Sequence, residues 1–235
     1  MKLNKTGILT AGLLMGACTA ASAGQIDIFD LQNDAGTQNL FTDTQNEGPI
    51  YDNNSSYAQL TDTDGNNDDI MAALMFEFAG FSEQNSFGIF DRSNTGERVQ
   101  IFDGGDSSQS GGSREVKFDL ANGTAESFYN EANISRYFGF YLERNGTYFF
   151  SDPSLNANND DMAAIFDVSE SWNSGFEGSD LIVAFEDLSS EGGSDWDYND
   201  MVVGVNDVKS VPEPGTLALF GLGLAGLGLS FRRRT

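Results

Sequence analysis

The sequence predicts an all-β protein, a jelly-roll-like antiparallel β-sandwich, with an N-terminal signal peptide and a C-terminal transmembrane helix. Its apolar residues form short runs that are rich in β-branched and aromatic side chains. Clusters of Gly, Asn, Asp and Ser separate these runs, and no long helical period is present, which is typical of a sandwich. The predicted strands are 26–29, 73–78, 87–90, 99–102, 115–120, 137–142, 148–150, 163–168, 181–185 and 201–205.

Composition restricts the functions open to the chain. Of its 235 residues, 36 are Asp or Glu and 12 are Lys or Arg, which gives a formal charge of −24. A surface this acidic repels phosphate backbones and argues against nucleic-acid binding. The chain has no histidine, which removes histidine acid–base chemistry and imidazole metal sites. We therefore expect a protein that is not an enzyme, since any catalysis would rest on carboxylates alone.

The N-terminus has the pattern of a secretory signal peptide, residues 1–23. Lys2 and Lys5 precede an apolar run, and Ala21-Ser22-Ala23 supplies the small residues that signal peptidase requires. Export with cleavage after Ala23 is the expectation. The single cysteine, Cys18, lies within this segment, and a lipoprotein anchored there is the alternative.

The C-terminal segment, 211–235, ends in an uncharged run of Leu, Ala, Gly, Phe and Ser at 216–231, closed by Arg232 to Arg234. A helix over this run reaches roughly 24 Å, and snorkelling arginines allow it to span a membrane core of about 30 Å. Because arginines stay on the cytoplasmic side, the rest of the chain is expected across the inner membrane. Four glycines within 221–228 make a buried soluble helix the weaker alternative.

The order of these features resembles a known sorting signal. Val211-Pro212-Glu213-Pro214, the Gly/Leu span and the arginine cluster are similar to the PEP-CTERM signal of Gram-negative bacteria. The resemblance implies processing by exosortase, a membrane protease, after transit through the inner membrane. It also implies delivery to the cell envelope, the outer surface or an exopolysaccharide matrix.

Between the two ends lies one acidic domain, residues 24–210. It carries seven basic and 35 acidic residues, a formal charge of −28. Such a domain repels itself unless cations bind it or salt screens it. The chain's only cysteine, Cys18, would leave with the signal peptide, so no disulfide can stabilise the mature domain. Bound cations and high-salt adaptation are therefore the two explanations of its acidity.

The densest group of oxygen ligands lies near the end of this domain. Phe185-Glu186-Asp187 is followed by Asp195-Trp196-Asp197-Tyr198-Asn199-Asp200, directly before an apolar strand. Carboxylate and amide oxygens in this number suit Ca²⁺, which takes six to eight of them, although a solvated acidic turn remains the alternative. The predicted calcium ligands are Glu186, Asp187, Asp195, Asp197, Asn199 and Asp200.

Two similar acidic stretches, at 66–73 and 158–164, form a second and weaker candidate. Each places Asn and Asp just before a predicted strand, a pattern that is also common in plain turns. Neither these loops nor the one at Asp195 has the Gly and Glu that an EF-hand requires at its sixth and twelfth positions. The residues of the weaker site are Asp62, Asp64, Asn66, Asp68, Asp160 and Asp161.

The FED and DWDYND motifs also resemble a family. Together with Phe138-Gly139-Phe140 and Ser151-Asp152 upstream, they are similar to the domain-of-unknown-function family 4114, most clearly over 136–207. That resemblance implies calcium binding by the six residues named above. It implies no catalytic activity.

Three functional interpretations follow. The first is an exported structural or adhesive protein of the envelope, exopolysaccharide or biofilm matrix that calcium stabilises. The second is a calcium-dependent glycan-binding module with Trp172 and Trp196 as stacking platforms, although most such residues only border a core. The third and weakest is a glycoside hydrolase, for which two carboxylates would need a defined separation.

Overall fold

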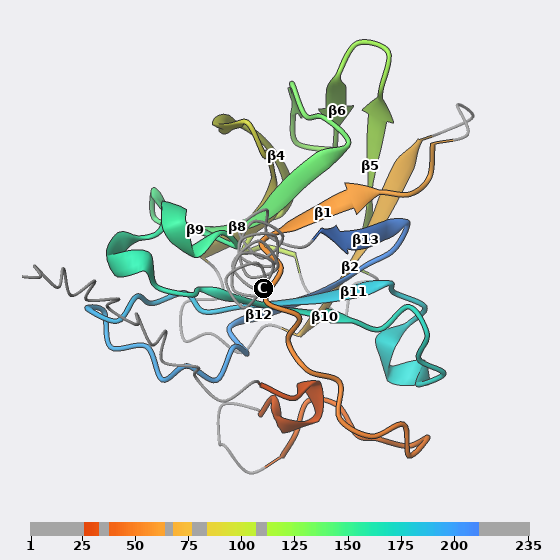
Figure 1. Ribbon diagram of the computed structural model, residues 1–235. Helices are drawn as coiled ribbons and strands as arrows, with labels where there is room; N and C mark the ends of the chain where they lie inside the picture. The colour runs from red at the N-terminus through yellow and green to blue at the C-terminus, as the bar shows by residue number, and fades with distance from the viewer. Residues whose placement is uncertain (1–25, 33–37, 64–67, 77–83, 107–111, 212–235) are drawn as a thin grey trace, which may run out of the picture.

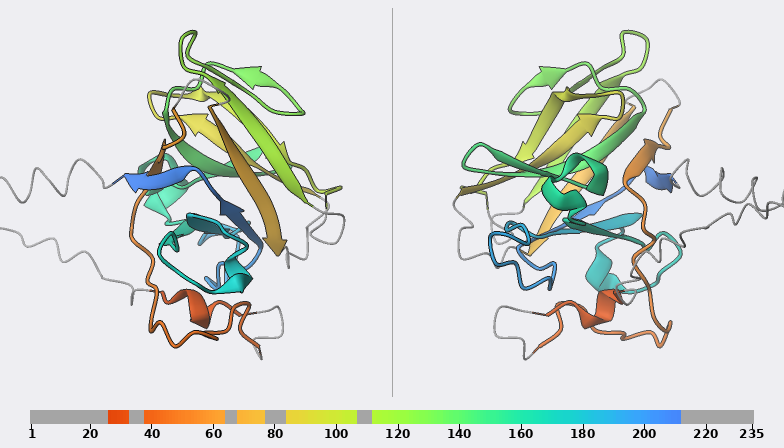
Figure 2. Two further views of the ribbon diagram at one scale, coloured as in Figure 1. Left: turned by 90° about the vertical axis from the view of Figure 1, so that its right-hand side faces the viewer. Right: turned by 60° about the vertical axis from the view of Figure 1, so that its left-hand side comes forward.

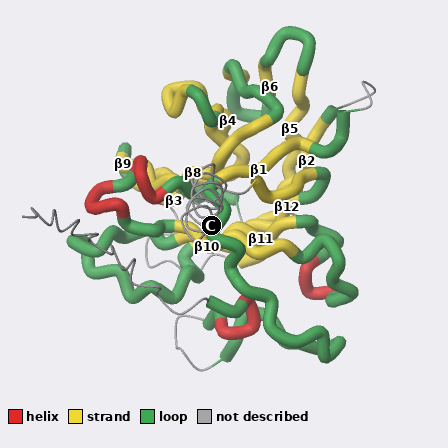
Figure 3. The backbone as a smooth tube through the Cα atoms, in the orientation of Figure 1, coloured by secondary structure: helices red, strands yellow, loops and turns green. Residues whose placement is uncertain are grey.

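The structure is a computed structural model that describes residues 26–32, 38–63, 68–76, 84–106 and 112–211. Over these residues the chain forms two antiparallel sheets, and its only helical segments are short 3-10 turns (Figures 1 and 3). No helix in this part of the chain is long and apolar enough to cross a membrane. The predicted signal peptide and the predicted span at 216–231 lie outside the described residues.

The first sheet has six strands, in the order β13-β1-β8-β3-β4, with β9 also paired to β8. Strand β8 is central: β3 pairs along one edge, while β1 and β9 share the other. The strands are β1 (Tyr57–Leu60), β3 (Asn85–Asp91), β4 (Asn94–Phe102), β8 (Tyr137–Arg144), β9 (Thr147–Phe150) and β13 (Val208–Val211).

The second sheet has seven strands, in the order β10-β11-β12-β2-β5-β6-β7. Figure 2 shows the chain passing repeatedly between the two sheets. The all-β class and the antiparallel sandwich are confirmed, whereas the jelly-roll connectivity stays a prediction. The strands are β2 (Asp69–Phe76), β5 (Ser113–Asp119), β6 (Thr124–Glu126), β7 (Glu131–Ala132), β10 (Ala163–Asp167), β11 (Leu181–Phe185) and β12 (Met201–Val205).

The main core fills the space between the sheets. Phe87, Phe138 and Phe140 of the six-stranded sheet join one hydrophobic cluster with Val183 and Val203 of the seven-stranded sheet. Alternate side chains of a strand point to opposite faces, so each strand contributes every second residue to this cluster. Burial of these apolar side chains supplies the main driving force for folding.

A second core covers the outer face of the seven-stranded sheet. There the N-terminal residues Ile28, Leu31 and Phe41 cluster with Phe166 and Ile182. Strands β11 and β12 are therefore buried on both faces, which explains their continuous apolar sequences. The predicted strand at 26–29 is wrong: Ile28–Asp30 forms a 3-10 turn (η1) that Asp27 caps.

Asn145-Gly146, a dipeptide that favours two-residue hairpin turns, joins β8 to β9, and these two strands pair. Both turn residues have positive φ, 50° and 82°, which matches the right-handed twist of a two-residue turn. The two sequences Phe87-Gly88 and Phe138-Gly139 lie on neighbouring strands. Gly88 is paired with Tyr141, and Gly139 with Phe90, so each glycine leaves space for the ring on the other strand.

Strands β1, β6, β7 and β13 are absent from the strands that the sequence predicts. They are only two to four residues long, so their pattern is too short to detect. Strand β13 ends at Val211, the first residue of the predicted sorting motif, and pairs there with Tyr57. Residues Pro212, Glu213 and Pro214 lie outside the described residues.

The seven-stranded sheet has two acidic ends. Because neighbouring strands are antiparallel, the end of β11 meets the starts of β10 and β12, as the pairs Phe185–Met201 and Ala163–Phe185 show. We call this the FED end, defined by Glu186, Asp187 and the loop 194–200. The start of β2 lies at the other end, beside the end of β12 and the start of β11. We call that the distal end; its carboxylates are Asp62, Asp69, Glu115, Asp180 and Asp207.

Candidate metal centre

The FED motif sits where β11 leaves the sheet, and its two carboxylates point in different directions. Consecutive residues of an extended chain project to opposite sides. Glu186, which is 0% exposed, faces the loop 194–200, where it accepts hydrogen bonds from the Ser194 hydroxyl and, at 2.6 Å, from the Tyr198 N–H. Asp187 instead faces the six-stranded sheet. The motif therefore connects the loop with the interface between the sheets.

Asp187 forms a buried ion pair that joins the two sheets. Its side chain is 2% exposed, and Oδ1 lies 3.1 Å from Nη1 of Arg144, at the end of β8. Its Oδ2 accepts a hydrogen bond of 3.1 Å from the Asn85 side chain, at the start of β3. Within the described residues the amide oxygen of the buried Asn85 has no hydrogen-bond partner. The charge of Asp187 is thus already balanced by the Arg144 guanidinium, so we assign it a structural role rather than a place among the metal ligands.

The loop 194–200 has an unusual backbone. Trp196 and Tyr198 adopt positive φ, 60° and 54°, a left-handed conformation that costs about 1–2 kcal/mol for a residue with a side chain. Contacts with the rest of the fold hold it in place: the Tyr198 hydroxyl donates to the Asp161 carbonyl oxygen at 2.8 Å, and its N–H donates to Glu186. This backbone turns the side chains of Asp195 and Asp197 back toward Glu186.

Glu186, Asp195 and Asp197 form the site. Each offers a carboxylate oxygen, and these oxygens lie within 4.8 Å of one another. Ligand oxygens about 2.3–2.6 Å from a shared Ca²⁺ ion have such separations. Burial raises the pKa of Glu186 above its ordinary value, and the charges of Asp197 and Asp195 add to the increase. Neither Glu186 nor Asp195 takes part in an ion pair within the described part of the chain.

The other predicted ligands in this region have different surroundings. The Asn199 side-chain amide donates to the Gln32 carbonyl oxygen at 2.5 Å and to Asp197 at 2.6 Å, which ties the loop to the N-terminal segment. Asp200 Oδ2 accepts from the Asp187 N–H at 2.7 Å. Burial raises the pKa of Asp200 to about 7, and the charges of Asp187 and Glu186 contribute. The structure thus brings together three of the six predicted ligands, and the others surround them.

The weaker predicted site is divided between the two ends of the sheet. Asp160 lies at the FED end, where it accepts hydrogen bonds of 2.8 Å from the Ser190 N–H and hydroxyl, and Asp161 lies beside it. Asp62 and Asp68 precede β2 at the distal end. Asp64 and Asn66 lie outside the described residues. The sequences at 66–73 and 158–164 are alike, but Asp68 lies at the distal end of the seven-stranded sheet and Asp160 at its FED end.

The two tryptophans differ in exposure. Trp172 is 86% exposed, and its backbone N–H donates to Glu47 at 2.6 Å. Both residues line a hollow, together with Asp167 and Glu170. Trp196 is 39% exposed, with its ring 6.4 Å from that of Tyr198. Trp172 therefore has the more accessible ring.

Sequence reasoning missed three residues that shape this centre. Ser194 hydrogen-bonds Glu186, while Arg144 and Asn85 hold Asp187. Ser194 directly precedes the acidic motif and was detectable as part of a turn. Arg144 and Asn85 come from strands 43 and 102 residues away, and no local pattern connects them with the motif.

The fold and the site define an acidic β-sandwich with a buried carboxylate centre at one end of a sheet. Comparison with known sequence families identifies two segments of the chain. Residues 115–207 match the domain of unknown function DUF4114, and residues 210–234 match the PEP-CTERM protein-sorting motif. The second match indicates an exported, exosortase-processed protein of the Gram-negative cell envelope. No curated protein and no solved structure matches the chain significantly.

The DUF4114 match is not a separate unit of the fold. It runs from β5 through β12, yet β2 lies between β5 and β12 in the seven-stranded sheet, and β3 pairs with β8. It contains Glu186, Asp195 and Asp197 as well as Arg144. Asn85 lies outside it, so the ion-pair network of Asp187 extends beyond the matched segment.

Proposed function

We propose that the chain is an exported, non-enzymatic structural or adhesive protein of the cell envelope or exopolysaccharide matrix, stabilised by Ca²⁺ bound at Glu186, Asp195 and Asp197. The observation that carries the calcium proposal is the meeting of three carboxylates, one of them the fully buried Glu186, which has no basic partner among the residues that the structure describes. A buried carboxylate without a cation is costly. Calcium would balance this charge and fix a strained loop.

The proposed coordination uses each residue differently. Each oxygen of Glu186 accepts one hydrogen bond and keeps a further lone pair for an ion. Asp195 is exposed and Asp197 half-buried, so an ion can enter from the solvent side. Water and loop carbonyl groups would complete the six to eight oxygen ligands that Ca²⁺ takes.

Thermal melting with calcium and with chelator tests this proposal. An ion that binds only the native state adds about 2.7 kcal/mol of stability at a hundredfold excess over its dissociation constant. Glu186→Gln should abolish the calcium-dependent increase in melting temperature. The matched control is Glu126→Gln, an exposed carboxylate in β6, which should retain it. Equal melting temperatures with calcium and with chelator would favour high-salt adaptation as the reason for the acidity.

Processing of the sorting segment is tested separately. Strand β13 ends at Val211, so a protease that acts near 212–214 cuts directly after the last strand residue that the structure describes. Mass spectrometry of the exported protein should find a new C-terminus close to this point, with 217–235 missing. Intact Arg232 to Arg234 on surface-located protein would instead indicate a lasting anchor.

A calcium-dependent glycan-binding module is the second candidate, and the exposed ring of Trp172 favours it. Carboxylates beside an aromatic ring are suited to sugar hydroxyl groups. A glycan array with and without calcium tests it, with Trp172→Ala as the variant. Turnover of a polysaccharide that is lost in Glu186→Gln would overturn both proposals in favour of a glycoside hydrolase.

A further inference from the structure

The outer face of the six-stranded sheet carries a hollow that the proposed function does not use. Phe138, Phe140 and Leu142 of β8 face the main core, whereas Tyr141 belongs to a cluster on the opposite face. The hollow lies on that face and measures about 410 Å³. Its lining residues are Gly96, Arg98, Gln100, Tyr129, Asn130, Tyr141 and Tyr148.

The Tyr141 ring, which lies over a glycine in the middle of the sheet, forms part of the floor of this hollow. Gly88 of β3 is paired with Gln100 of β4 on one side and with Tyr141 of β8 on the other. A Cβ atom at Gly88 would lie 2.2 Å from the Val99 carbonyl oxygen and 2.7 Å from the Tyr141 ring. The Tyr141 ring therefore occupies the space above Gly88, and no side chain of β3 fills the hollow there.

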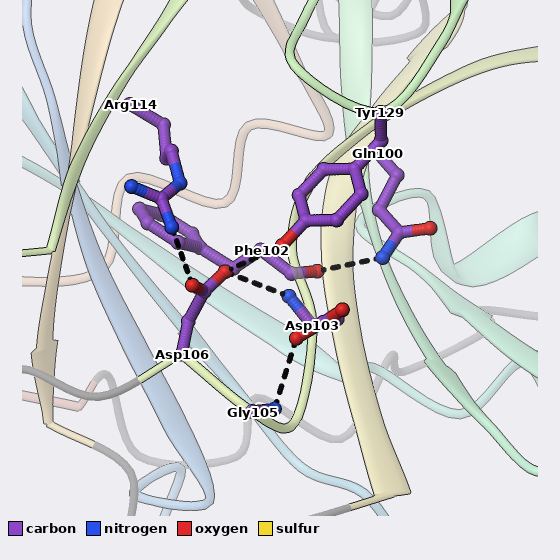
Figure 4. Close-up of polar contacts among 7 residues, drawn as sticks. All are labelled: Gln100, Phe102, Asp103, Gly105, Asp106, Arg114 and Tyr129. Carbon is purple, nitrogen blue, oxygen red and sulfur yellow. Dashed lines mark hydrogen bonds and ion pairs between the residues drawn. The ribbon is translucent and has the colours of Figure 1, made fainter.

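Hydrogen bonds from behind hold the walls of the hollow. The Tyr129 hydroxyl donates to Asp106 at 2.8 Å, and Asp106 forms an ion pair of 2.5 Å with Arg114 (Figure 4). The Asn130 side chain accepts from the Gln100 N–H at 2.9 Å and donates to the Arg98 carbonyl oxygen at 2.7 Å. Asn130 thereby covers the open edge of β4. Walls fixed in this way need little reordering when a ligand binds.

The charge of the hollow differs from that of the rest of the domain. Among the described residues no Asp or Glu lines it, although 35 of them lie within 24–210. Three other hollows on the described surface each contain a carboxylate, for example Asp167, Asp161 or Glu115. The Arg98 guanidinium is the one charged group among the described lining residues, and its central carbon lies 4.0 Å above the centre of the Tyr148 ring. This local charge favours an anionic ligand.

Arg98 retains hydrogen-bonding capacity for such a ligand. Its Nη1 donates to the Thr95 carbonyl oxygen at 2.6 Å, and no other hydrogen bond of this guanidinium is found among the described residues. A guanidinium has five N–H donors and binds a carboxylate with two of them in parallel. Tyr148, which is 37% exposed, adds aromatic surface next to it.

We propose that this hollow binds a carboxylated sugar unit of an acidic glycan. The carboxylate pairs with Arg98, the C–H surface of the sugar ring lies against the exposed part of Tyr148, and the hydroxyl groups meet the amide of Gln100. Charges of the domain farther away than about 8 Å are screened at physiological salt. Of the carboxylates nearby, Asp106 behind Tyr129 is paired with Arg114, and Glu143, whose charge acts on Tyr141, lies outside the lining. The guanidinium of Arg98 is therefore the charge that a ligand in the hollow meets directly. The site does not depend on the proposed calcium centre, whose ligands adjoin strands of the other sheet.

Isothermal titration of the full exported protein tests the proposal, with tetragalacturonate as the acidic probe and cellotetraose as the neutral one. The acidic probe should bind, and Arg98→Gln should weaken its binding roughly tenfold or more, as expected for loss of a charge-assisted hydrogen-bonded pair. The matched control is Arg136→Gln, which removes a guanidinium 5.8 Å from the centre of the Tyr137 ring. It should change the binding less than twofold.

Chelator separates this proposal from the calcium proposal, since acidic-probe binding should persist in the folded protein without calcium. If Arg98→Gln does not fold, Arg98→Lys keeps the positive charge but loses the parallel pair of donors, and should still bind more weakly. Equal binding of both probes, unchanged binding in Arg98→Lys, or no binding of tetragalacturonate by the wild-type protein would overturn the proposal.

Discussion

The FED end and the distal end of the seven-stranded sheet are both rich in carboxylates but arrange them differently. At the distal end the carboxylates lie side by side on neighbouring strands and loops: Asp69 interacts with Glu115, and Glu115 lies 3.2 Å from Lys117. At the FED end the loop folds back over Glu186, and three carboxylates converge on one point. A group of acidic residues is therefore not enough to form a candidate metal centre. At the FED end the centre arises because the loop 194–200 folds back over the buried Glu186.

The two ends also differ in how they deal with like charges. Raised pKa values occur at both ends: burial, with the hydrogen bond and charge of Glu115, raises the pKa of Asp69 to about 6, and burial raises that of Asp200 at the FED end to about 7. The ends differ in their buried partners: at the FED end the buried Asp187 has a guanidinium, whereas the partners of Glu186 among the described residues are neutral hydrogen-bond donors. This difference leads to three predictions.

Breaking the Asp187 ion pair should have the largest effect. Arg144→Met leaves a carboxylate that is 2% exposed without its cation, which should lower the free energy of unfolding by about 3–5 kcal/mol. The comparison variant is Arg114→Met, whose pair with Asp106 is more exposed and should contribute about 1 kcal/mol or less. Urea denaturation measures both. Equal losses in the two variants would show that burial at the FED end is not the deciding factor.

One substitution at each end tests the calcium proposal by comparison. Calcium should stabilise the wild-type protein by about 2.7 kcal/mol at a hundredfold excess over the dissociation constant. Asp197→Asn should remove a large part of that stabilisation. Asp69→Asn should leave that stabilisation unchanged, because no group of three carboxylates converges around Asp69 in the described part of the chain. Calorimetric melting with calcium and with chelator gives both values. A loss in Asp69→Asn alone would place the ion at the distal end.

The smallest expected effect is a pH dependence opposite in sign to ordinary acid denaturation. The folded-state pKa of Asp69 is about 6 and that of Asp200 about 7, each above the ordinary 3.8. The native state therefore holds more protons than the unfolded state between about pH 4 and 7, and stability falls as pH rises through this range.

In chelator, the melting temperature should be higher at pH 5 than at pH 7.5. Asp69→Asn should reduce this difference without removing it, because Asp200 still titrates. A melting temperature that rises steadily from pH 5 to 7.5 in the wild-type protein would contradict the prediction. Calcium should oppose the trend, since the ion requires ionised carboxylates.

Part of the fold was predictable because its signals are local. The hairpin at Asn145-Gly146 follows from two residues that tolerate positive φ, and the bounds of β11 and β12 follow from uninterrupted apolar runs. The segment at 26–29 has the same apolar character but forms a 3-10 turn, because it covers a sheet rather than joining one. Its apolar residues are required because they are buried, and a buried apolar residue can belong to a turn as well as to a strand.

The sequence alone determined the composition of the candidate site, its acidity and its position before an apolar strand. Only the tertiary structure decided that Glu186, Asp195 and Asp197 converge while Asp187 turns to Arg144, because that choice depends on a left-handed loop and on strands distant in the chain. The same holds for the hollow at Arg98, whose floor exists because Gly88, Gln100 and Tyr141 meet in one row of the sheet. Residue types can be seen in the sequence, whereas strand register is set by the packing of the whole sandwich. The sequence therefore predicted which ligand types the site contains, but not how their side chains are arranged.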